Sequence, residues 1–340
     1  MARSYYLFKS GTLKRKDNTL YLKIKDEKSR SIPVEDVQDI YVFGELTINS
    51  KLMTFLSQNG ILLHFFSSKI LDDDGDYKDG FYMGTYYPRE KLISGKLLVK
   101  QVEHYADNQK RQIIAIKILK AAAFNIYRNL RYYNERGKNL EDEISDVKKL
   151  RSKMDKTKSI PELMGLEGNI RETYYRSWNK IVEQNIDFQK RVKRPPDNMI
   201  NSILSYINTL VYTTVLGELY RTQLNPTISY LHEPGTKRFS LSLDLAEVFK
   251  PIIAERLIFS LLNKKQITEK SFQKRSNFLY LKDEARLTIL KAYDQKLKAT
   301  IRHKELKREV SYKHLIRLEC YKLIKHLLGE KEYLGFEMWW

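Results

Sequence analysis

Cysteine is almost absent from this chain, because Cys320 is the only one among its 340 residues. One cysteine excludes an intrachain disulfide and any metal site made of several thiolates. This composition suits a reducing compartment, and we therefore expect a cytoplasmic protein. The first six residues, MARSYY, also lack the apolar core and the small-residue cleavage site of a signal peptide, so we expect no secretion signal.

One stretch lacks charge over nearly the length of a membrane span, since residues 199–217 carry no charged side chain. Its polar side chains are Asn201, Ser202, Ser205, Asn208, Thr209, Thr213 and Thr214. That many polar groups are costly on an isolated helix that faces lipid. We therefore predict a helix buried inside the protein and no membrane span.

Acidic side chains are too few to balance the basic ones, with 42 Asp and Glu against 61 Lys and Arg. Residues 1–90 hold 13 of each sign, so the whole net charge of +19 belongs to residues 91–340. A basic block of this kind is the electrostatic pattern expected of a nucleic-acid-binding surface. A lysine-rich surface that only aids solubility is the alternative, and composition favours neither.

The hydrophobic pattern predicts an α+β protein that begins with a small β-rich domain, residues 1–88. Asp17 and Asn18 are predicted to form a hairpin turn, and Asn49 or Ser50 to cap a helix over residues 51–58. The acidic segment 72–76 is predicted to be an exposed loop. Runs of β-forming residues predict strands at 13–16, 19–24, 31–34, 39–44 and 61–66.

A larger all-α domain, residues 89–340, is predicted to follow. After Pro88 the apolar residues recur at helical spacing. The basic segment 190–196, KRVKRPP, is predicted to be a loop, because paired prolines cannot continue a helix. From Leu243 to about residue 328 the chain is predicted to be helical again.

Three side chains of the second domain are candidates for binding a divalent cation: Glu167, His232 and Glu247. One imidazole and two carboxylates can hold such a cation and leave positions open for water and substrate. Asp244 lies three residues before Glu247 and shares a helix face with it. Taken singly, each has a more ordinary explanation as a capping acid, a surface charge or an exposed histidine.

These side chains lie in separated motifs. Each motif resembles a motif of one protein family, and they follow one another in the same order as in that family. The motifs are Glu167-Gly168 with Arg171 and Tyr174-Tyr175, then Asn201, then Leu231-His232-Glu233, and then the run DLAEVFKP at 244–251, with weaker similarity at 31–44 and 60–66. Over essentially its whole length the chain resembles the CRISPR-associated spacer-acquisition endonuclease/integrase family. Any one of these motifs alone would not be specific.

The resemblance implies a metal-dependent DNA endonuclease and integrase that joins the 3′-hydroxyl ends of spacer DNA to the CRISPR repeat. It implies that Glu167, His232 and Glu247 bind Mg²⁺ or Mn²⁺, and that Asp244 is a further catalytic acid. It also implies a homodimer, formed through the β-rich domain, that flanks a small ferredoxin-like adaptation partner. The family often has Asp where Glu247 stands and Arg where Lys250 stands, and the charge is retained at both positions.

Several basic side chains are candidates for contact with DNA. Arg171, Lys250 and Arg256 are predicted to lie near the reacting phosphate, and more distant backbone contacts are predicted for Lys190, Arg191, Lys193 and Arg194. For each of them an ordinary solvated charge is the alternative. Tyrosines beside basic residues, as in RNLRYY at 128–133, either stack on unpaired bases or belong to the core.

Two other functions fit the same residues. A stand-alone structure-specific DNA nuclease would use the same metal site to cut branched DNA without joining ends. A non-catalytic nucleic-acid-binding scaffold would use the acids only for structure. Substitution of His232 by Ala separates these hypotheses, because it should abolish activity and spare DNA binding only if the protein is an enzyme.

Overall fold

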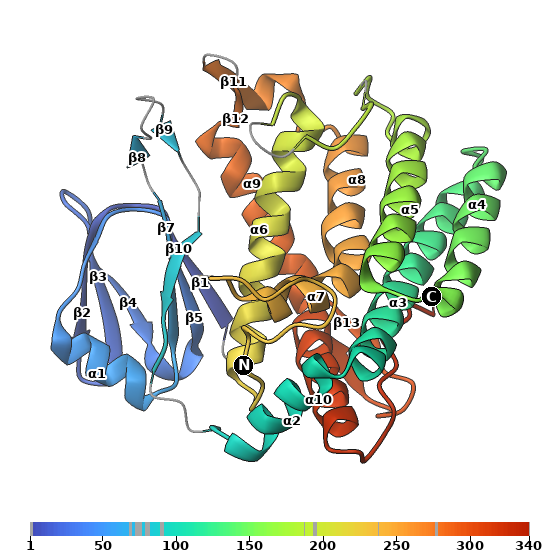
Figure 1. Ribbon diagram of the computed structural model, residues 1–340. Coiled ribbons are helices and arrows are strands. Elements are labelled where there is room, and N and C mark those ends of the chain that lie inside the picture. The colour runs from blue at the N-terminus through green and yellow to red at the C-terminus, as the bar shows by residue number, and fades with distance from the viewer. Residues whose placement is uncertain are drawn as a thin grey trace. The chain divides into compact units, whose positions relative to one another are not determined.

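The computed structural model describes residues 3–67, 70–71, 77–78, 82–88, 92–186, 188–192, 196–236, 238–275 and 278–339. The chain divides into two compact units, Met1–Ile93 and Ser94–Trp340. The first is built mainly of strands and the second mainly of helices (Figure 1). This order confirms the predicted α+β class, with a small β-rich part before a larger helical part.

Two four-stranded sheets form the framework of the first unit. In one, β1, β5 and β7 pair in parallel and β10 joins antiparallel; in the other the order is β4-β3-β2-β6. Leu13, Leu20 and Leu52 are fully buried in the shared core. The strands are β1 (Arg3–Leu7), β2 (Gly11–Lys16), β3 (Thr19–Lys23), β4 (Arg30–Pro33), β5 (Val37–Val42), β6 (Leu46–Thr47), β7 (Leu62–Phe66) and β10 (Tyr82–Tyr86), with a separate pair β8 (Ile70–Leu71) and β9 (Tyr77–Lys78).

Local chemistry fixes the turns of this unit where the sequence predicts them. The hairpin between β2 and β3 turns at Asp17, whose φ of 52° is a left-handed conformation that Asp tolerates. The Asn49 side chain accepts a hydrogen bond from the Leu52 amide at 3.0 Å and so caps α1 (Ser50–Gln58). The loop predicted over 72–76 lies outside the described residues.

The longer helical segments of the second unit surround an apolar core. Leu163, Leu204 and Phe259 are among its fully buried side chains. The segments are α2 (Gly95–Ala106), α3 (Asn108–Asn134), α4 (Glu141–Lys153), α5 (Ile160–Ile181), α6 (Met199–Tyr220), α7 (Ser240–Phe249), the π-helical turn η3 (Lys250–Glu255), α8 (Arg256–Asn263), α9 (Asp283–Lys298) and α10 (Tyr312–Leu327). Helix α3 packs against α4, α5 and α7, so it braces the elements that carry the candidate metal ligands.

The uncharged stretch forms the buried helix α6, as predicted. Among the described residues it is the one helix long and apolar enough to cross a membrane, and 72% of its most apolar window is buried inside the protein. Two of its buried hydroxyl groups are satisfied within the helix, since Thr213 and Thr214 donate to the carbonyl groups four residues earlier.

The second unit is mostly helical as predicted, but the prediction of helix from Leu243 to about residue 328 missed two hairpins. Hairpins interrupt the helices between residues 264 and 312. One joins β11 (Phe272–Arg275) to β12 (Phe278–Leu281), and the other joins β13 (Thr300–Arg302) to β14 (Glu309–Ser311). Strands of three or four residues give too short an alternation to be distinguished from helix ends in a single sequence.

A π-helical turn links α7 to α8 and shapes the region around Glu247. Its Pro251 has no N–H to give to the helix, and two buried asparagines of α3 bind the carbonyl groups at this irregular turn. Asn125 donates to the Val248 carbonyl at 3.0 Å, and Asn129 donates to the Pro251 carbonyl at 2.8 Å. The helix break is therefore held rigidly by α3.

Candidate metal centre

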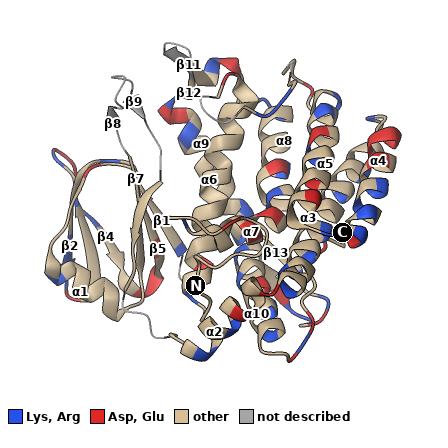
Figure 2. Ribbon diagram, viewed as in Figure 1, with Lys and Arg blue, Asp and Glu red and all other residues tan. Residues whose placement is uncertain are grey.

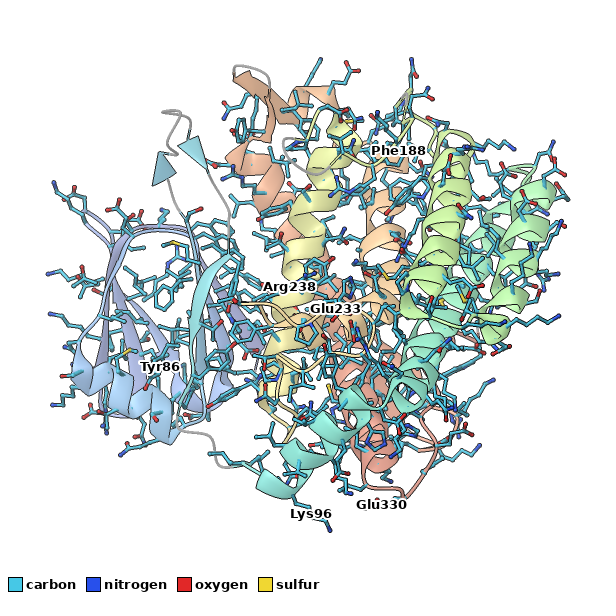
Figure 3. All side chains as sticks on the ribbon, viewed as in Figure 1. Tyr86, Lys96, Phe188, Glu233, Arg238 and Glu330 are labelled. Carbon is cyan, nitrogen blue, oxygen red and sulfur yellow. The ribbon has the colours of Figure 1, made fainter. Side chains whose placement is uncertain are left out.

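The three predicted ligands come from separate elements of the helical unit. Glu167 lies on α5, Glu247 lies on α7, and His232 lies in the loop between α6 and α7. Figure 3 labels the neighbouring Glu233 and Arg238, which mark this loop in front of α6, and Figure 2 shows acidic segments on α5 and α7. Arg111 of α3 anchors the loop, because its guanidinium donates to the Tyr230 carbonyl at 2.9 Å and to Glu233 at 2.6 Å.

Asp244 of α7 fixes the loop that carries His232 through hydrogen bonds. Its fully buried carboxylate accepts hydrogen bonds from the backbone amides of Tyr230, Leu231 and His232 at 2.7–3.0 Å. The same carboxylate lies 2.8 Å from Nδ1 of His232. A carboxylate in this position keeps the proton on Nδ1 and leaves the lone pair of Nε2 for a ligand.

Arg171 joins the acids of three helical segments. From α5 its guanidinium donates to Glu167 at 3.1 Å, to Glu247 at 2.7 Å and to Glu255 of η3 at 2.6 Å. The Arg171 side chain is only 10% exposed, and the carboxylates take up all three of its nitrogen atoms. Burial acts against its charge, but Glu255 and the other acids raise the pKa of Arg171 well above its ordinary value.

Glu247 is ionised despite its burial. Burial raises its pKa, but Lys250, which donates to Oε1 of Glu247, and Arg171 together lower that pKa to about 2. Lys250 itself lies 4.9 Å from the centre of the Tyr212 ring. Three carboxyl groups, those of Glu167, Glu247 and Glu255, meet only two cations, Arg171 and Lys250, in these ion pairs, which suits a site for a further cation.

The donor set fits a hard divalent cation, although the side chains do not form a compact cluster. Within the described part of the chain, no three His, Cys, Asp or Glu side chains are grouped closely enough to enclose a metal ion. The carboxylates of Glu167 and Glu247 are bridged by Arg171 instead, and the His232 imidazole, when protonated, is near enough to lower the pKa of Glu247. Ionised carboxylates and an imidazole with a free Nε2 are the donors that Mg²⁺ or Mn²⁺ accepts.

The structure separates the predicted DNA-contacting residues into different environments. Arg171 and Lys250 are bound to carboxylates at the candidate centre, whereas Arg256 points to a separate cleft. Arg191 is half-buried and donates to the Asn201 side chain and to Ser205, while Lys190 is exposed. Lys193 and Arg194 lie outside the described residues. DNA contact stays a prediction for all of these side chains.

The sequence-based reasoning missed Glu255, which is buried and is the third acid bound to Arg171. Burial raises the pKa of Glu255, and Arg171 acts in the opposite direction. In the sequence Glu255 lies eight residues after Glu247, about two helical turns further along, and this spacing is the signal that could have identified it. The intervening Pro251 concealed that regularity.

Comparison with known proteins identifies the family. The family model described as CRISPR associated protein Cas1 matches residues 5–295. The CRISPR-associated endonuclease Cas1 of Fusobacterium nucleatum is 57% identical over 100% of this chain and 98% of its own length. The CRISPR-associated endonuclease Cas1 of Thermotoga maritima is 44% identical over 96% of this chain and 98% of its own length.

Solved structures agree with these relatives. A CAS1 protein from Thermotoga maritima has a TM-score of 0.84 and 42% identity, over 98% of this chain and all of its own. A casposase bound to integration product shares the fold with a TM-score of 0.83 at 21% identity, over 98% of this chain and 94% of its own. The chain therefore belongs to the Cas1 family of CRISPR-associated proteins, and the two relatives above are named endonucleases. The predicted family, fold and enzyme class are confirmed.

Proposed function

We propose that this protein is a metal-dependent DNA endonuclease and integrase of CRISPR adaptation, which joins the 3′-hydroxyl ends of spacer DNA to a CRISPR repeat. The observation that carries this proposal is the oriented His232, held by Asp244 next to ionised Glu247. The casposase of the same fold is described as bound to integration product, which supports phosphodiester joining as the reaction.

The carboxylate oxygens of Glu167 and Glu247 and the Nε2 atom of His232 would hold Mg²⁺ or Mn²⁺. Such an ion makes the phosphorus of a phosphodiester more electrophilic and stabilises charge on the leaving oxygen. Asp244 orients His232 and its loop, so it is a positioning residue rather than a ligand. Arg171 and Lys250 keep Glu247 ionised and hold its carboxylate in place between α5 and α7.

The assembly is part of the same proposal. The β-rich domain, residues 1–88, forms a homodimer, and the helical domain, residues 89–340, binds DNA and carries out the reaction. A small ferredoxin-like protein spaces two such dimers along the DNA in the cytoplasm. Solved structures described as Cas6-RT-Cas1–Cas2 complexes share this fold, one of them with a TM-score of 0.80, and support a Cas2 partner.

An integration assay tests the reaction. A short duplex with free 3′-hydroxyl ends is incubated with a supercoiled plasmid that carries a CRISPR repeat, in Mn²⁺, Mg²⁺ or EDTA. We expect metal-dependent joining by the wild type and none by Glu247→Ala. Glu172→Ala is the matched control, because Glu172 is an exposed carboxylate on α5 that pairs with Arg176.

The assay also separates the alternatives. Nicking without joining, even with the small partner present, would replace the proposal by a stand-alone structure-specific nuclease. DNA binding without any metal-dependent cleavage or joining would leave a nucleic-acid-binding scaffold. Equal activity of Glu247→Ala and the wild type would remove the proposed centre from the reaction.

A further inference from the structure

A polar cleft lies in the helical unit, and its lining does not include Glu167, His232 or Glu247. It has a volume of about 830 Å³, and residues of α3, α8, α9 and α10 line it. Among the lining residues, Glu183 is the one carboxylate, and it lies 3.8 Å from Lys138. The basic residues of the lining are Arg136, Lys138, Arg256, Lys264 and Lys296. The cleft therefore carries a large excess of positive charge.

Three of these cations are held by aromatic rings instead of acids. The guanidinium carbon of Arg136 lies 3.6 Å from the centre of the Tyr132 ring, and that of Arg256 lies 4.9 Å from the same ring. The ammonium group of Lys296 lies 4.0 Å from the centre of the Tyr312 ring. Ring faces attract cations and orient them without neutralising them.

Neutral atoms supply the remaining contacts of these cations. Arg256 donates to the sulfur of Met338 at 3.1 Å, and Arg136 donates to the backbone carbonyl of Tyr132 at 3.0 Å. No ion pair joins Arg136, Arg256 or Lys296 to an acid within the residues that the structure describes. Within the described part of the chain, these three positive charges therefore have no acid in an ion pair.

The charge of Lys296 is destabilised in the folded protein. Burial, and then the nearby charge of Arg256, lower the pKa of Lys296 to about 8. A half-buried cation next to another cation works against folding, since each disfavours the charged form of the other. Such groups gather where a ligand of opposite charge completes the site.

The cleft adjoins the candidate metal centre, because two consecutive residues belong one to each site. Glu255 is bound to Arg171 at that centre, and the next residue, Arg256, lines the cleft. The lining also includes Glu183, just beyond the end of α5, and the fifteen helical residues from Glu167 to Ile181 span about 21 Å. A DNA strand rises about 3.4 Å per nucleotide, so this length corresponds to roughly six nucleotides.

We propose that this cleft binds phosphate groups, and that the ligand is a phosphodiester of the DNA strand or the phosphate of a free nucleotide. Arg136, Arg256 and Lys296 provide the donors, and the rings of Tyr132 and Tyr312 orient them. For the DNA strand, the inference rests on the proposed function, and the cleft anchors the strand a few nucleotides away from the reacting phosphate. The tyrosines then act by holding cations rather than by stacking on bases.

Fluorescence anisotropy of the full chain tests the cleft. The probe is a 5′-fluorescein-labelled twelve-nucleotide oligothymidylate, titrated in EDTA at several salt concentrations. The variant is Lys296→Met, and Lys291→Met is the matched control because Lys291 is exposed on the same helix, α9, and does not line the cleft. We expect Lys296→Met to weaken binding about tenfold and to reduce the salt slope by about 1, as loss of one phosphate contact does.

Competition identifies the source of the phosphate. Unlabelled thymidine monophosphate and pyrophosphate are added to the same complex. Displacement of the labelled strand from the wild type and not from Lys296→Met assigns the cleft to a free phosphate ligand, whereas failure to displace it assigns the cleft to the strand. Unchanged affinity and salt slope in Lys296→Met would overturn the proposal.

Two further measurements keep the test decisive. Arg136→Gln changes an exposed side chain of the cleft and should weaken strand binding without lowering the melting temperature. Because the titrations are made without metal, their result does not depend on catalysis at Glu247. Loss of strand binding in the cleft variants together with unaltered Glu247-dependent nicking would support the cleft alone, and the reverse pattern would support only the metal centre.

Discussion

The candidate metal centre and the phosphate-binding cleft, both in the helical unit, gather cations in opposite ways. At the centre, Arg171 and Lys250 are bound to carboxylates at 2.5–3.1 Å. In the cleft, Arg256 and Lys296 face tyrosine rings and a thioether. The difference indicates the charge of each ligand, because paired cations leave an excess of acid for a metal ion, whereas unpaired cations require an anion.

Burial makes the energetic difference between paired and unpaired cations large. A buried ion pair is held by mutual attraction and hydrogen bonds, but a buried cation without an acid keeps most of its desolvation penalty. The pKa values follow the same division, since that of Glu247 is lowered to about 2 and that of Lys296 to about 8. The nearby cations Lys250 and Arg171 lower the pKa of Glu247, whereas burial and then the charge of Arg256 lower that of Lys296.

The largest expected effect comes from removing the imidazole of the candidate centre. His232→Ala deletes the predicted nitrogen ligand, and we expect metal-dependent joining to fall by at least about 10³-fold, as loss of a group that acts in the transition state does. DNA affinity in EDTA should remain within about twofold of the wild type. Joining at more than a tenth of the wild-type rate would exclude His232 from the site.

Arg171→Met removes the cation that joins the three acids and tests the paired side of the comparison. Leaving three carboxylates without it should lower the free energy of unfolding by about 3–5 kcal/mol, which denaturant titration measures. Arg176→Met is the control on the same helix, because Arg176 forms an exposed pair with Glu172. That change should have an effect of at most about 1 kcal/mol. Equal effects of the two variants would contradict the central role of Arg171.

Asp244→Asn tests whether the buried acid acts through His232. An amide cannot accept all four hydrogen bonds that the carboxylate receives, so the tautomer and position of the imidazole should become less defined. We expect Mn²⁺ affinity to fall about 10–100-fold. Calorimetric titration with Mn²⁺ measures this loss, and an unchanged affinity would reduce Asp244 to a purely structural role.

Lys296→Met should stabilise the protein, because it removes a half-buried cation that is not paired with an acid. This variant tests the cost of the unpaired charge in the cleft. Below pH 8 Lys296 is charged in both the folded and the unfolded chain, so the folded state bears the full cost of its burial. Between pH 8 and its ordinary value of 10.5 the folded protein releases this proton first, and the cost disappears as the pH rises. We expect an advantage on the order of 1–3 kcal/mol at pH 7.

Melting curves of wild type, Lys296→Met and Lys291→Met between pH 7 and 10 measure this effect. The advantage of Lys296→Met over the wild type should shrink towards pH 10, and Lys291→Met should follow the wild type throughout. A pH-independent advantage would indicate that improved packing, and not the removed charge, stabilises the variant.

The sequence predicted elements that depend on local chemistry. The Asp17 turn, the Asn49 cap and the buried helix over residues 199–217 are all present. Each follows from interactions within a few residues or from hydropathy along one helix. The two short hairpins near residues 275 and 305 were missed, because strands of three or four residues are decided by tertiary contacts.

The candidate site shows the same limit. Motif order identified Glu167, His232 and Glu247, but Arg171 binds Glu255 over 84 positions of sequence, and no local pattern predicts that contact. The cleft depends on still more distant residues, since Arg256 meets Tyr132 of α3 and Met338 near the end of the chain. Charge counting predicted a basic unit but could not say which cations lack an acid.

Binding of Mn²⁺, followed by the electron paramagnetic resonance signal of the free ion, tests the central claim most directly. We predict one Mn²⁺ per wild-type chain, with affinity lowered at least about tenfold in Glu167→Gln and in Glu247→Gln and retained in Glu172→Gln. This result would establish that the paired acids of α5 and α7 share one metal ion. Wild-type affinity in Glu247→Gln would contradict the proposed centre.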